Sequence, residues 1–416
     1  MGETPMWSIE PEKRALSPAA RDRGHATRPA AAARALCVLA VAAPVIAEAA
    51  PFSVGAPSLR PARIVEPIAV FGSDDRVKLP ASHKGLADKI GVILNVRTKS
   101  VCTAFCVAPN VVATAAHCLF HTSGEQPARL SDIRFRTTLQ SRANEAAIEG
   151  AERGSGAQFV LPGSTHLSIR PPINATDDWA LLRLAGPACR KGSLAISTMT
   201  QDEVIEHAGR GEVFQVAYHR DFPGWRLALG RGCEIGREFN GSDWPSIARD
   251  FSDPGRLLLH ACDTGGASSG SPLIVNGLNG PEVVGINVGT YVQSKVMMQN
   301  GEVIERLGAD TIANTGLTTA PIAQRLAAFR DAAILDSPRA ISALQEALSR
   351  RDMYHGAIDG AYGPMLRVAI ERCEQEMGLA VTGLASEALL ARLNGVESTR
   401  RPPNTQVLRT DARKPR

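Results

Sequence analysis

Residues 102–118 read Cys102-Thr-Ala-Phe-Cys-Val-Ala-Pro-Asn-Val-Val-Ala-Thr-Ala-Ala-His117-Cys118. This apolar run is broken once, by Pro109-Asn110, and it predicts a buried strand that ends at a histidine. A strand and a neighbouring disulfide would hold the imidazole in one position, and the pKa of histidine lies near working pH. His117 is therefore a candidate general base, and it needs a carboxylate and a hydroxyl nucleophile from elsewhere in the chain.

The composition favours a loop-rich β protein with more than one domain. A chain of 416 residues can hold two or three domains. Only 5% of the residues are aromatic, whereas glycine and proline number 37 and 27. The net charge of +4 is small, and basic residues gather in a tail, residues 396–416, for which we expect disorder. Nothing in this distribution indicates a nucleic-acid partner.

The N-terminal region predicts export. Arg34 precedes an apolar run at 35–47, and Ala47-Glu48-Ala49 fits a small-residue cleavage site. We therefore expect residues 1–49 to be a signal peptide with a long n-region, although a start downstream of Met1 stays open. The run is too short and too proline-broken for a membrane span. A periplasmic or secreted location follows.

Export makes the cysteines candidates for disulfide bonds. Of the eight cysteines, Cys37 lies in the signal segment, and an odd number remains, so at least one thiol stays unpaired in the chain. We expect two pairs, Cys102 with Cys118 and Cys233 with Cys262. Cys106 with Cys189 is a further candidate pair, and the states of Cys106, Cys189 and Cys373 stay open.

The hydrophobicity patterns along the chain change from irregular to β-type to helical, and they predict three regions after the signal segment. Residues 50–85 read as an irregular N-terminal arm. Residues 86–335 carry short β-type runs separated by turn residues, and a helical pattern near Pro321 closes this region. Residues 336–395 carry three short amphipathic helices around a glycine-punctuated loop. The clearest β-type runs begin at Ile90, Val111, Trp179, Val213, Leu257, Pro272 and Val283.

Two later motifs supply the groups that His117 needs. Asp177-Asp178 heads an apolar strand, and Asp178, which adjoins the strand, is the better candidate to be buried against the imidazole. Residues 262–272 read Cys-Asp-Thr-Gly-Gly-Ala-Ser-Ser269-Gly-Ser-Pro. Small residues let this backbone turn sharply, so that the amides of Ala267 and Ser269 form an oxyanion hole beside the Ser269 nucleophile. The order His, Asp, Ser is one of several that triads use.

Together these motifs resemble the chymotrypsin/trypsin-like serine peptidases. The resemblance rests on Thr114-Ala-Ala-His-Cys118, Asp178-Trp-Ala-Leu-Leu and Ser268-Ser-Gly-Ser-Pro272, and it covers roughly residues 68–330. Gly-Ser-Asp-Asp-Arg near residue 74 is most similar to the bacterial glutamyl endopeptidase branch. The resemblance implies a mainly β fold of two six-stranded antiparallel β-barrels with the site between them. It also implies a protein or peptide substrate, cleaved through an acyl-enzyme on Ser269.

One departure from the family bears on activation. Many trypsin-like enzymes place an aspartate just before the nucleophile, where it pairs with a newly made N-terminus, but Ser268 occupies that position here. We therefore expect no such activation, although Arg63-Ile64-Val65 resembles an activation site. Trimming of the arm before residue 80 stays open.

Specificity has two competing interpretations. The glutamyl branch binds the substrate carboxylate with a histidine and a threonine. Thr264 matches the threonine, but Asn287 replaces the histidine, so we expect no strict glutamate preference. Asp263 stands where trypsin-like enzymes carry the acid that selects arginine or lysine; the alternative is a structural aspartate beside a disulfide. Residues 285–290 are expected to form the edge strand that pairs with substrate backbone.

The C-terminal region resembles the peptidoglycan-binding domain of bacterial cell-wall enzymes, a small three-helix module. The matching residues are Gln345, Leu348, Gly356, Gly360, Gly363-Pro364, Ala369-Ile370, Gly378-Leu379, Thr382-Gly383 and Leu389-Leu390. Leu366 and Cys373-Glu374 depart from the family, which has Thr and Phe-Gln there. The resemblance implies localisation to peptidoglycan; the alternative is a helical module for stability, autoinhibition or partner docking.

The sequence thus predicts an exported serine endopeptidase that acts at or near the cell wall. One alternative is a catalytically silent protease-fold scaffold that binds cell wall. A second alternative is an enzyme whose substrate is the cell-wall peptide itself. We expect no cofactor and no metal, since no phosphate-binding loop and no Cys/His set at zinc spacing is present. The natural substrate and the oligomeric state stay open.

Overall fold

The computed structural model describes residues 2–7, 69–120, 129–168, 170–231, 233–239, 241–299 and 302–395. Side chains are described in these ranges except at 2–7, 293–299 and 302–310. The apolar run at 35–47, Arg63-Ile64-Val65 and the basic tail lie outside the described residues. Within the described ranges, no helix combines the length and the hydrophobicity that a membrane span requires.

The first sheet has seven antiparallel strands in the order β7-β6-β3-β4-β5-β9-β8. An isolated bridge between Ile148 and Leu184 joins the ends of β7 and β9, which curls the sheet back on itself. Its strands are β3 (Ile90–Asn95), β4 (Val101–Ala108), β5 (Val111–Thr114), β6 (Ile133–Arg136), β7 (Ala146–Ala147), β8 (Val160–Pro162) and β9 (Ala180–Arg183).

The apolar runs of this sheet are continuous because both of its faces are covered. Along β4, Phe105 and Val107 pack into one buried cluster, whereas Ala104 and Cys106 pack into another. Ile90 and Val92 of β3 face the first of these clusters. Since side chains alternate along a strand, a strand buried on both faces needs apolar residues at every position.

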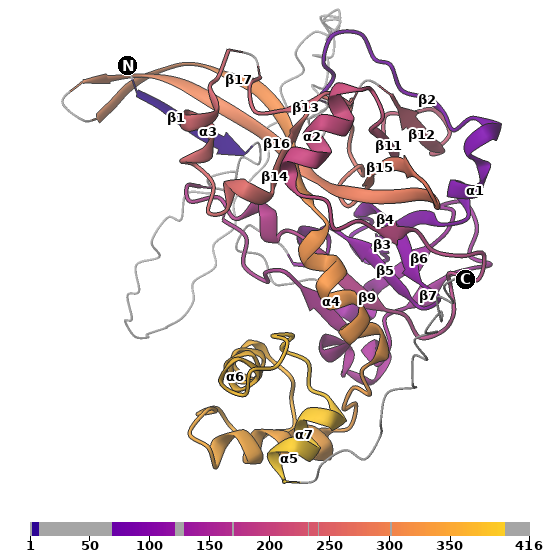
Figure 1. Ribbon diagram of the computed structural model, residues 1–416, viewed down its shortest axis with the longest axis vertical. Helices are drawn as coiled ribbons and strands as arrows, with labels where there is room; N and C mark the ends of the chain where they lie inside the picture. Colours follow the sequence, from indigo (N-terminus) through magenta and orange to yellow (C-terminus); the bar gives the residue numbers. More distant parts are fainter. Residues whose placement is uncertain are drawn as a thin grey trace, which may run out of the picture. The chain divides into compact units, whose positions relative to one another are not determined.

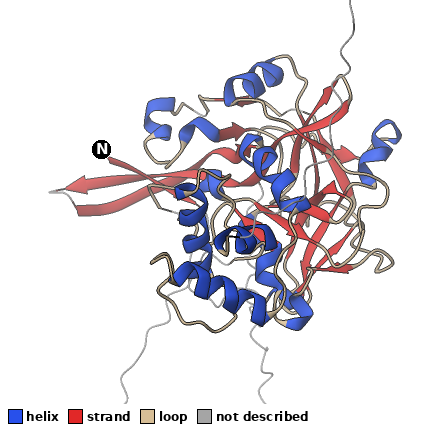
Figure 2. Ribbon diagram, turned by 60° about the horizontal axis from the view of Figure 1, so that its bottom comes forward, coloured by secondary structure: helices blue, strands red, loops and turns tan. Residues whose placement is uncertain are grey.

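The second sheet has ten strands, eight of them in the order β13-β14-β17-β16-β15-β11-β12-β2. Two further strands, β1 (Gly2–Trp7) and β10 (Ala195–Ile196), pair with β16. The long strands β16 and β17 run side by side as an antiparallel pair (Figure 1, and in red in Figure 2). The eight are β2 (Val77–Lys78), β11 (Phe214–Tyr218), β12 (Leu227–Gly230), β13 (Ile235–Gly236), β14 (Leu257–His260), β15 (Pro272–Gly277), β16 (Gly280–Gln299) and β17 (Glu302–Thr318).

The predicted fold class is confirmed: the chain is mainly β, with two curled antiparallel sheets. The strand numbers differ from the expected six, because very short strands such as β2, β7 and β13 join the sheets and β1 adds to β16. The helices of the described residues are α1 (Lys84–Ala87), α2 (Gln201–Gly209), α3 (Trp244–Ala248), α4 (Ala320–Asp331), α5 (Pro338–Ser349), α6 (Pro364–Glu376) and α7 (Glu387–Leu393).

Helix α4 is the helix predicted near Pro321, and Arg183 of β9 holds its C-terminal end. The Arg183 guanidinium donates to the carbonyls of Phe329 and Ala332, and it lies 5.3 Å from the centre of the Phe329 ring. A cation at a helix C-terminus meets the negative end of the helix dipole and the carbonyls that lack a partner in the helix. This contact fastens α4 to the first sheet.

The three predicted C-terminal helices are also confirmed, as α5, α6 and α7 (Figure 1). They enclose a core of their own, in which Ile341, Leu344 and Ile370 are almost fully buried. Ser337 and Ser386 begin α5 and α7, and each hydroxyl accepts a hydrogen bond from a first-turn amide. Gln345 is buried in this unit, where its side chain binds Asp359 and the Gly360 amide.

Candidate active site

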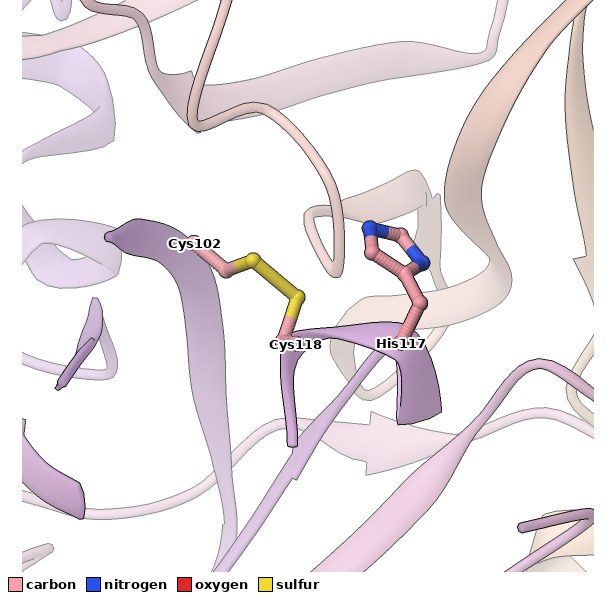
Figure 3. A group of neighbouring side chains, drawn as sticks. All are labelled: Cys102, His117 and Cys118. Carbon is pink, nitrogen blue, oxygen red and sulfur yellow. A yellow bond between two sulfur atoms is a disulfide. The ribbon is translucent and has the colours of Figure 1, made fainter. Parts of the chain in front are cut away.

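His117 lies on η2 (Ala116–Cys118), the turn that directly follows β5. A disulfide joins Cys118 to Cys102 of β4, with the two Cα atoms 6.2 Å apart. Figure 3 shows the imidazole projecting from the same turn as this disulfide. The turn is therefore fixed on one side by β5 and on the other by the cross-link to β4.

Asp178 holds the His117 imidazole in one orientation. One carboxylate oxygen accepts from the His117 backbone N–H at 2.8 Å, and the other lies 2.6 Å from ring atom Nδ1. Asp178 is buried and stands just before β9, which pairs with β5 through Thr114 and Ala180. This contact places the proton on Nδ1 and leaves Nε2 to act as the base. The neighbouring Asp177 pairs with Arg256 instead.

The same carboxylate sets the protonation of His117. Burial opposes the charged imidazole, but the negative charge of Asp178 and its hydrogen bond outweigh this effect and raise the pKa of His117. Two other buried histidines behave differently. Burial lowers the pKa of His219 to about 3 and that of His260 to about 4. Of these three imidazoles, His117 alone has a pKa that is raised, and the cause is its carboxylate partner.

The loop that carries Ser269 docks on the strands that carry the histidine turn. The Ser269 carbonyl accepts from the Thr103 backbone N–H at 2.9 Å. Gly270 has φ of +81°, and a Cβ on it would lie 2.3 Å from the Thr103 carbonyl and 2.8 Å from the Ala115 nitrogen. Only glycine permits this approach, which brings Ser269 to the segment just before His117.

The Ser269 side chain is partly exposed, and no hydrogen bond joins its hydroxyl to His117 within the part of the chain that the structure describes. Contacts between a nucleophile and its base are often long without substrate and tighten only in the reacting complex. The two residues are thus brought to one place by backbone contacts.

The amides of Ala267 and Ser269 are available to a ligand. Neither N–H donates to a protein acceptor within the described ranges, whereas the intervening Ser268 N–H donates to the Gly265 carbonyl. The Arg220 N–H donates to the Gly266 carbonyl at 2.6 Å. Since the C=O and N–H of a trans peptide point in opposite directions, this bond turns the Ala267 N–H away from Arg220.

Ala267 adopts φ of +78° in this arrangement, a conformation that costs a non-glycine residue about 1–3 kcal/mol. Such strain persists only where the surrounding contacts enforce it. Here they leave two amide donors free at one loop, which is the chemical requirement of an oxyanion hole.

Asp263 does not face substrate as a free carboxylate. One of its oxygens accepts from the Phe71 N–H at 2.8 Å and the other from the Asp75 N–H at 2.9 Å. Burial raises the pKa of this carboxyl group, and the two amide bonds lower it in part. Of the two interpretations drawn from the sequence, this geometry favours the structural one.

Thr264 and Asn287 are also engaged within the protein. The Thr264 hydroxyl donates to Asn314 Oδ1 at 3.2 Å, and Thr290 donates to the same oxygen at 2.8 Å. Asn287 Nδ2 donates to the Ser268 carbonyl at 3.2 Å, while its Oδ1 lies 3.1 Å from His260 Nε2. Sequence reasoning missed Thr290, Asn314 and His260, because single polar residues within apolar strands carry no periodic signal.

The described cysteines are paired except for Cys373. Disulfides join Cys106 to Cys189 and Cys233 to Cys262, while Cys373 is a free buried thiol. Potential ligand atoms of Cys102, His117 and Cys118 cluster within 4.8 Å of one another. The two sulfurs form a disulfide and offer no thiolates, so this group does not fit a metal ion.

Comparison with known proteins identifies two domains. Residues 102–286 match the trypsin-like peptidase domain family, and residues 337–393 match the peptidoglycan binding domain family. Among solved structures, a Glu endopeptidase in complex with MPD shows 17% identity and a TM-score of 0.39, covering 63% of this chain and 98% of that one. A thermostable serine protease AL20 from an extremophilic microorganism shows 17% identity and a TM-score of 0.34, covering 56% and 93%. A search of curated proteins finds no match.

The contact between Asp178 and His117 predicts a shift in pH dependence. His117 must be neutral to accept a proton, so the rate should rise as the pH increases through its pKa. Replacing Asp178 by Asn removes the charge that raises this pKa, and it leaves one amide oxygen where two carboxylate oxygens meet the His117 N–H and Nδ1. We expect hydrolysis of an activated ester to fall on the order of 10⁴-fold, with the acid limb of the pH–rate profile moved to lower pH.

The matched control is Asp177→Asn, because Asp177 is the adjacent carboxylate and pairs with Arg256. This variant should keep both the rate and the acid limb of the parent protein. An unchanged profile in Asp178→Asn would contradict the role given to Asp178.

Proposed function

We propose that this chain, in which a trypsin-like peptidase domain precedes a peptidoglycan-binding domain, is an active serine endopeptidase. The observation that carries the proposal is the two-point contact of Asp178 with the backbone N–H and Nδ1 of His117, at 2.8 and 2.6 Å. It fixes a neutral imidazole whose free Nε2 serves as a base. The loop of Ser269 is docked on the same strands.

The mechanism follows from these positions. Ser269 Oγ attacks the scissile carbonyl as His117 Nε2 takes the hydroxyl proton, and the Ala267 and Ser269 amides donate to the oxyanion that forms. The tetrahedral intermediate collapses when His117 returns the proton to the leaving amine. Water then attacks the acyl-enzyme by the same steps and releases Ser269.

A silent scaffold is the competing proposal, and the strain at Ala267 argues against it. The left-handed backbone at Ala267 is unfavourable by about 1–3 kcal/mol and accompanies two unpaired amides beside the nucleophile. In a scaffold without activity, no function would require the contacts that enforce this conformation. All three triad residues are also present.

The location proposed for this activity is outside the cytoplasm. Three disulfides form in the described residues, and disulfides persist in oxidising compartments. A peptidoglycan-binding domain is consistent with the same location. We therefore propose export and action near the cell wall, on a protein or peptide substrate.

Replacing Ser269 by Ala tests the activity directly. This variant should keep the fold and its unfolding temperature, and it should lose casein hydrolysis together with labelling by a fluorophosphonate. Ser271→Ala is a suitable control because Ser271 is a buried serine of the same loop, whose hydroxyl accepts from Gln215. Casein cleavage by Ser269→Ala at the parental rate would exclude the proposed mechanism.

The polar groups of the predicted specificity pocket favour an uncharged substrate side chain. Asp263 is occupied by two backbone amides, and the Asn287 amide is committed to Ser268 and His260. Thr264, Thr290 and Asn314 add neutral groups that bind one another. Neither an arginine nor a glutamate side chain finds an uncommitted charge of opposite sign among these residues.

Cleavage of peptides that carry Arg, Lys, Glu, Val or Thr before the scissile bond tests this proposal. We expect Val and Thr to exceed the charged residues in kcat/KM. The Asp263→Asn variant should keep the same order of substrates, although its stability should fall as hydrogen bonds to Phe71 and Asp75 weaken. A preference for Arg that disappears in Asp263→Asn would instead show that Asp263 reads the substrate.

The C-terminal unit is proposed to hold the enzyme at peptidoglycan. A surface hollow between α5 and the following loop is lined by Glu346, Ser349, Arg350 and Ile358. Ile358 is an exposed apolar side chain in this hollow, and its neighbours supply hydrogen-bonding groups. Apolar contact flanked by polar groups suits a sugar, which has both kinds of surface.

Co-sedimentation with purified sacculi tests this assignment, using the full chain with Ser269→Ala. We expect binding by this protein and at least tenfold weaker binding when Ile358→Asp is added, an effect of about 1.4 kcal/mol or more. Met365→Asp is the control, because Met365 is an exposed apolar residue on α6 that does not line the hollow. Absence of sedimentation, or equal losses in both variants, would contradict the proposed site.

A further inference from the structure

An ion cluster joins the N-terminal segment at 69–78 to the segment that follows β11. The Arg76 guanidinium is buried and lies between two carboxylates: it donates to Asp74 at 2.9 and 2.7 Å and to Asp221 at 3.2 and 2.6 Å. These two carboxylates raise the pKa of Arg76, so the cluster stays charged. Paired bonds from one planar guanidinium fix both carboxylates in orientation as well as in distance.

The nucleophile loop rests directly on this cluster. A Cβ on Gly265 would lie 1.9 Å from Asp221 Oδ1 and 3.0 Å from Arg76 Nη1, so the loop backbone is in contact with the ion pair. His219 and Arg220 hold the same stretch through hydrogen bonds. His219 Nδ1 accepts the Gly265 N–H at 3.1 Å, and the Arg220 N–H donates to the Gly266 carbonyl at 2.6 Å.

We propose that Arg76 and Asp221 are positioning residues for the oxyanion hole, an inference that rests on the proposed peptidase function. The ion pair fixes residues 219–221, these residues fix the Gly266 carbonyl, and the same rigid peptide carries the Ala267 N–H. Ala267 is held at φ of +78°, and a strained peptide of this kind turns to a relaxed orientation when its anchors loosen. The ion pair thereby acts on catalysis without touching substrate.

Part of the predicted N-terminal arm also supports the nucleophile loop. Ala69 exchanges two backbone hydrogen bonds with Thr264, at 3.1 and 2.9 Å, and the Phe71 and Asp75 amides bind Asp263. With Arg76, these contacts make residues 69–76 part of the support beneath the nucleophile loop. Trimming that leaves an active enzyme should therefore end before Ala69.

The test compares Arg76→Lys and Asp221→Asn with Arg136→Lys in the full chain. Lysine keeps the positive charge of Arg76 but lacks the planar guanidinium that binds both carboxylates. Asparagine keeps the shape of Asp221 but loses its negative charge. Arg136 is an equally buried arginine, paired with Glu145 in the first sheet. The readouts are kcat and KM on a peptide amide, inhibition by a peptide aldehyde, which forms an oxyanion on Ser269, and the unfolding temperature.

We expect kcat to fall roughly 10- to 100-fold in both test variants, with KM changed by less than about twofold. Affinity for the aldehyde should weaken in parallel, because its oxyanion uses the same amides. The Arg136→Lys variant should lose stability to a similar degree, yet keep the parental kcat and aldehyde affinity.

If folded Arg76→Lys keeps the kcat and the aldehyde affinity of the parent protein, the pair of Arg76 and Asp221 is merely structural. The same conclusion follows if only KM rises. If Arg76→Lys does not fold, Asp221→Asn decides by the same criteria. Failure of the positioning role can be distinguished from failure of the proposed peptidase function. Full activity of Ser269→Ala would overturn the peptidase mechanism, whereas full activity of both cluster variants would overturn only the positioning role.

Discussion

The proposed active site depends on Thr103, a buried residue of β4 that joins the two sheets. Its hydroxyl donates to the Ala267 carbonyl at 2.8 Å and accepts from the Tyr218 N–H of β11 at 3.0 Å. Its backbone N–H holds the Ser269 carbonyl, and its carbonyl accepts from the Thr114 hydroxyl of β5. The hydroxyl and the backbone N–H of Thr103 thus bind β11 and the nucleophile loop, while its carbonyl binds β5 on the histidine side. A buried side chain with two satisfied bonds fixes geometry more firmly than apolar packing, which has no direction.

The surroundings of each histidine decide its chemistry. His219 and His260 are buried and neutral, and each uses ring nitrogens to hold backbone or amide groups near the nucleophile loop. His117 differs because a carboxylate faces one ring nitrogen and leaves the other available. Burial thus lowers the pKa of His219 and of His260, whereas the contact with Asp178 raises the pKa of His117, as the proposed base role requires.

The sequence predicted the parts of this structure that have local signals. The C-terminal helices and eight strands follow from apolar patterns, the strands being β3, β4, β5, β9, β11, β14, β15 and the first part of β16. The triad candidates follow from short motifs of small residues around His117, Asp178 and Ser269. The contacts that hold those residues were not predictable in the same way. Arg76 meets Asp221, and Arg220 meets Gly266, across long separations in the chain and without a repeating pattern. The length of β16 and β17 was missed as well, since the predicted run ended near Val288 and the strand continues to Gln299.

Because residues 69–76 support the nucleophile loop, the two parts of the proposed site are expected to form at different stages of folding. The proposed general base and its disulfide lie at the end of β5 in the first sheet, whose strands all precede the second half of the peptidase region in the chain. The proposed oxyanion hole instead requires that a segment near residue 76, a segment near residue 221 and the loop at 263–269 come together. Contacts between distant segments form late because the closure of long loops is costly in entropy. On the proposed mechanism, a chain that has completed only its first sheet has a base but no place for the oxyanion, so it cannot yet cleave a peptide bond.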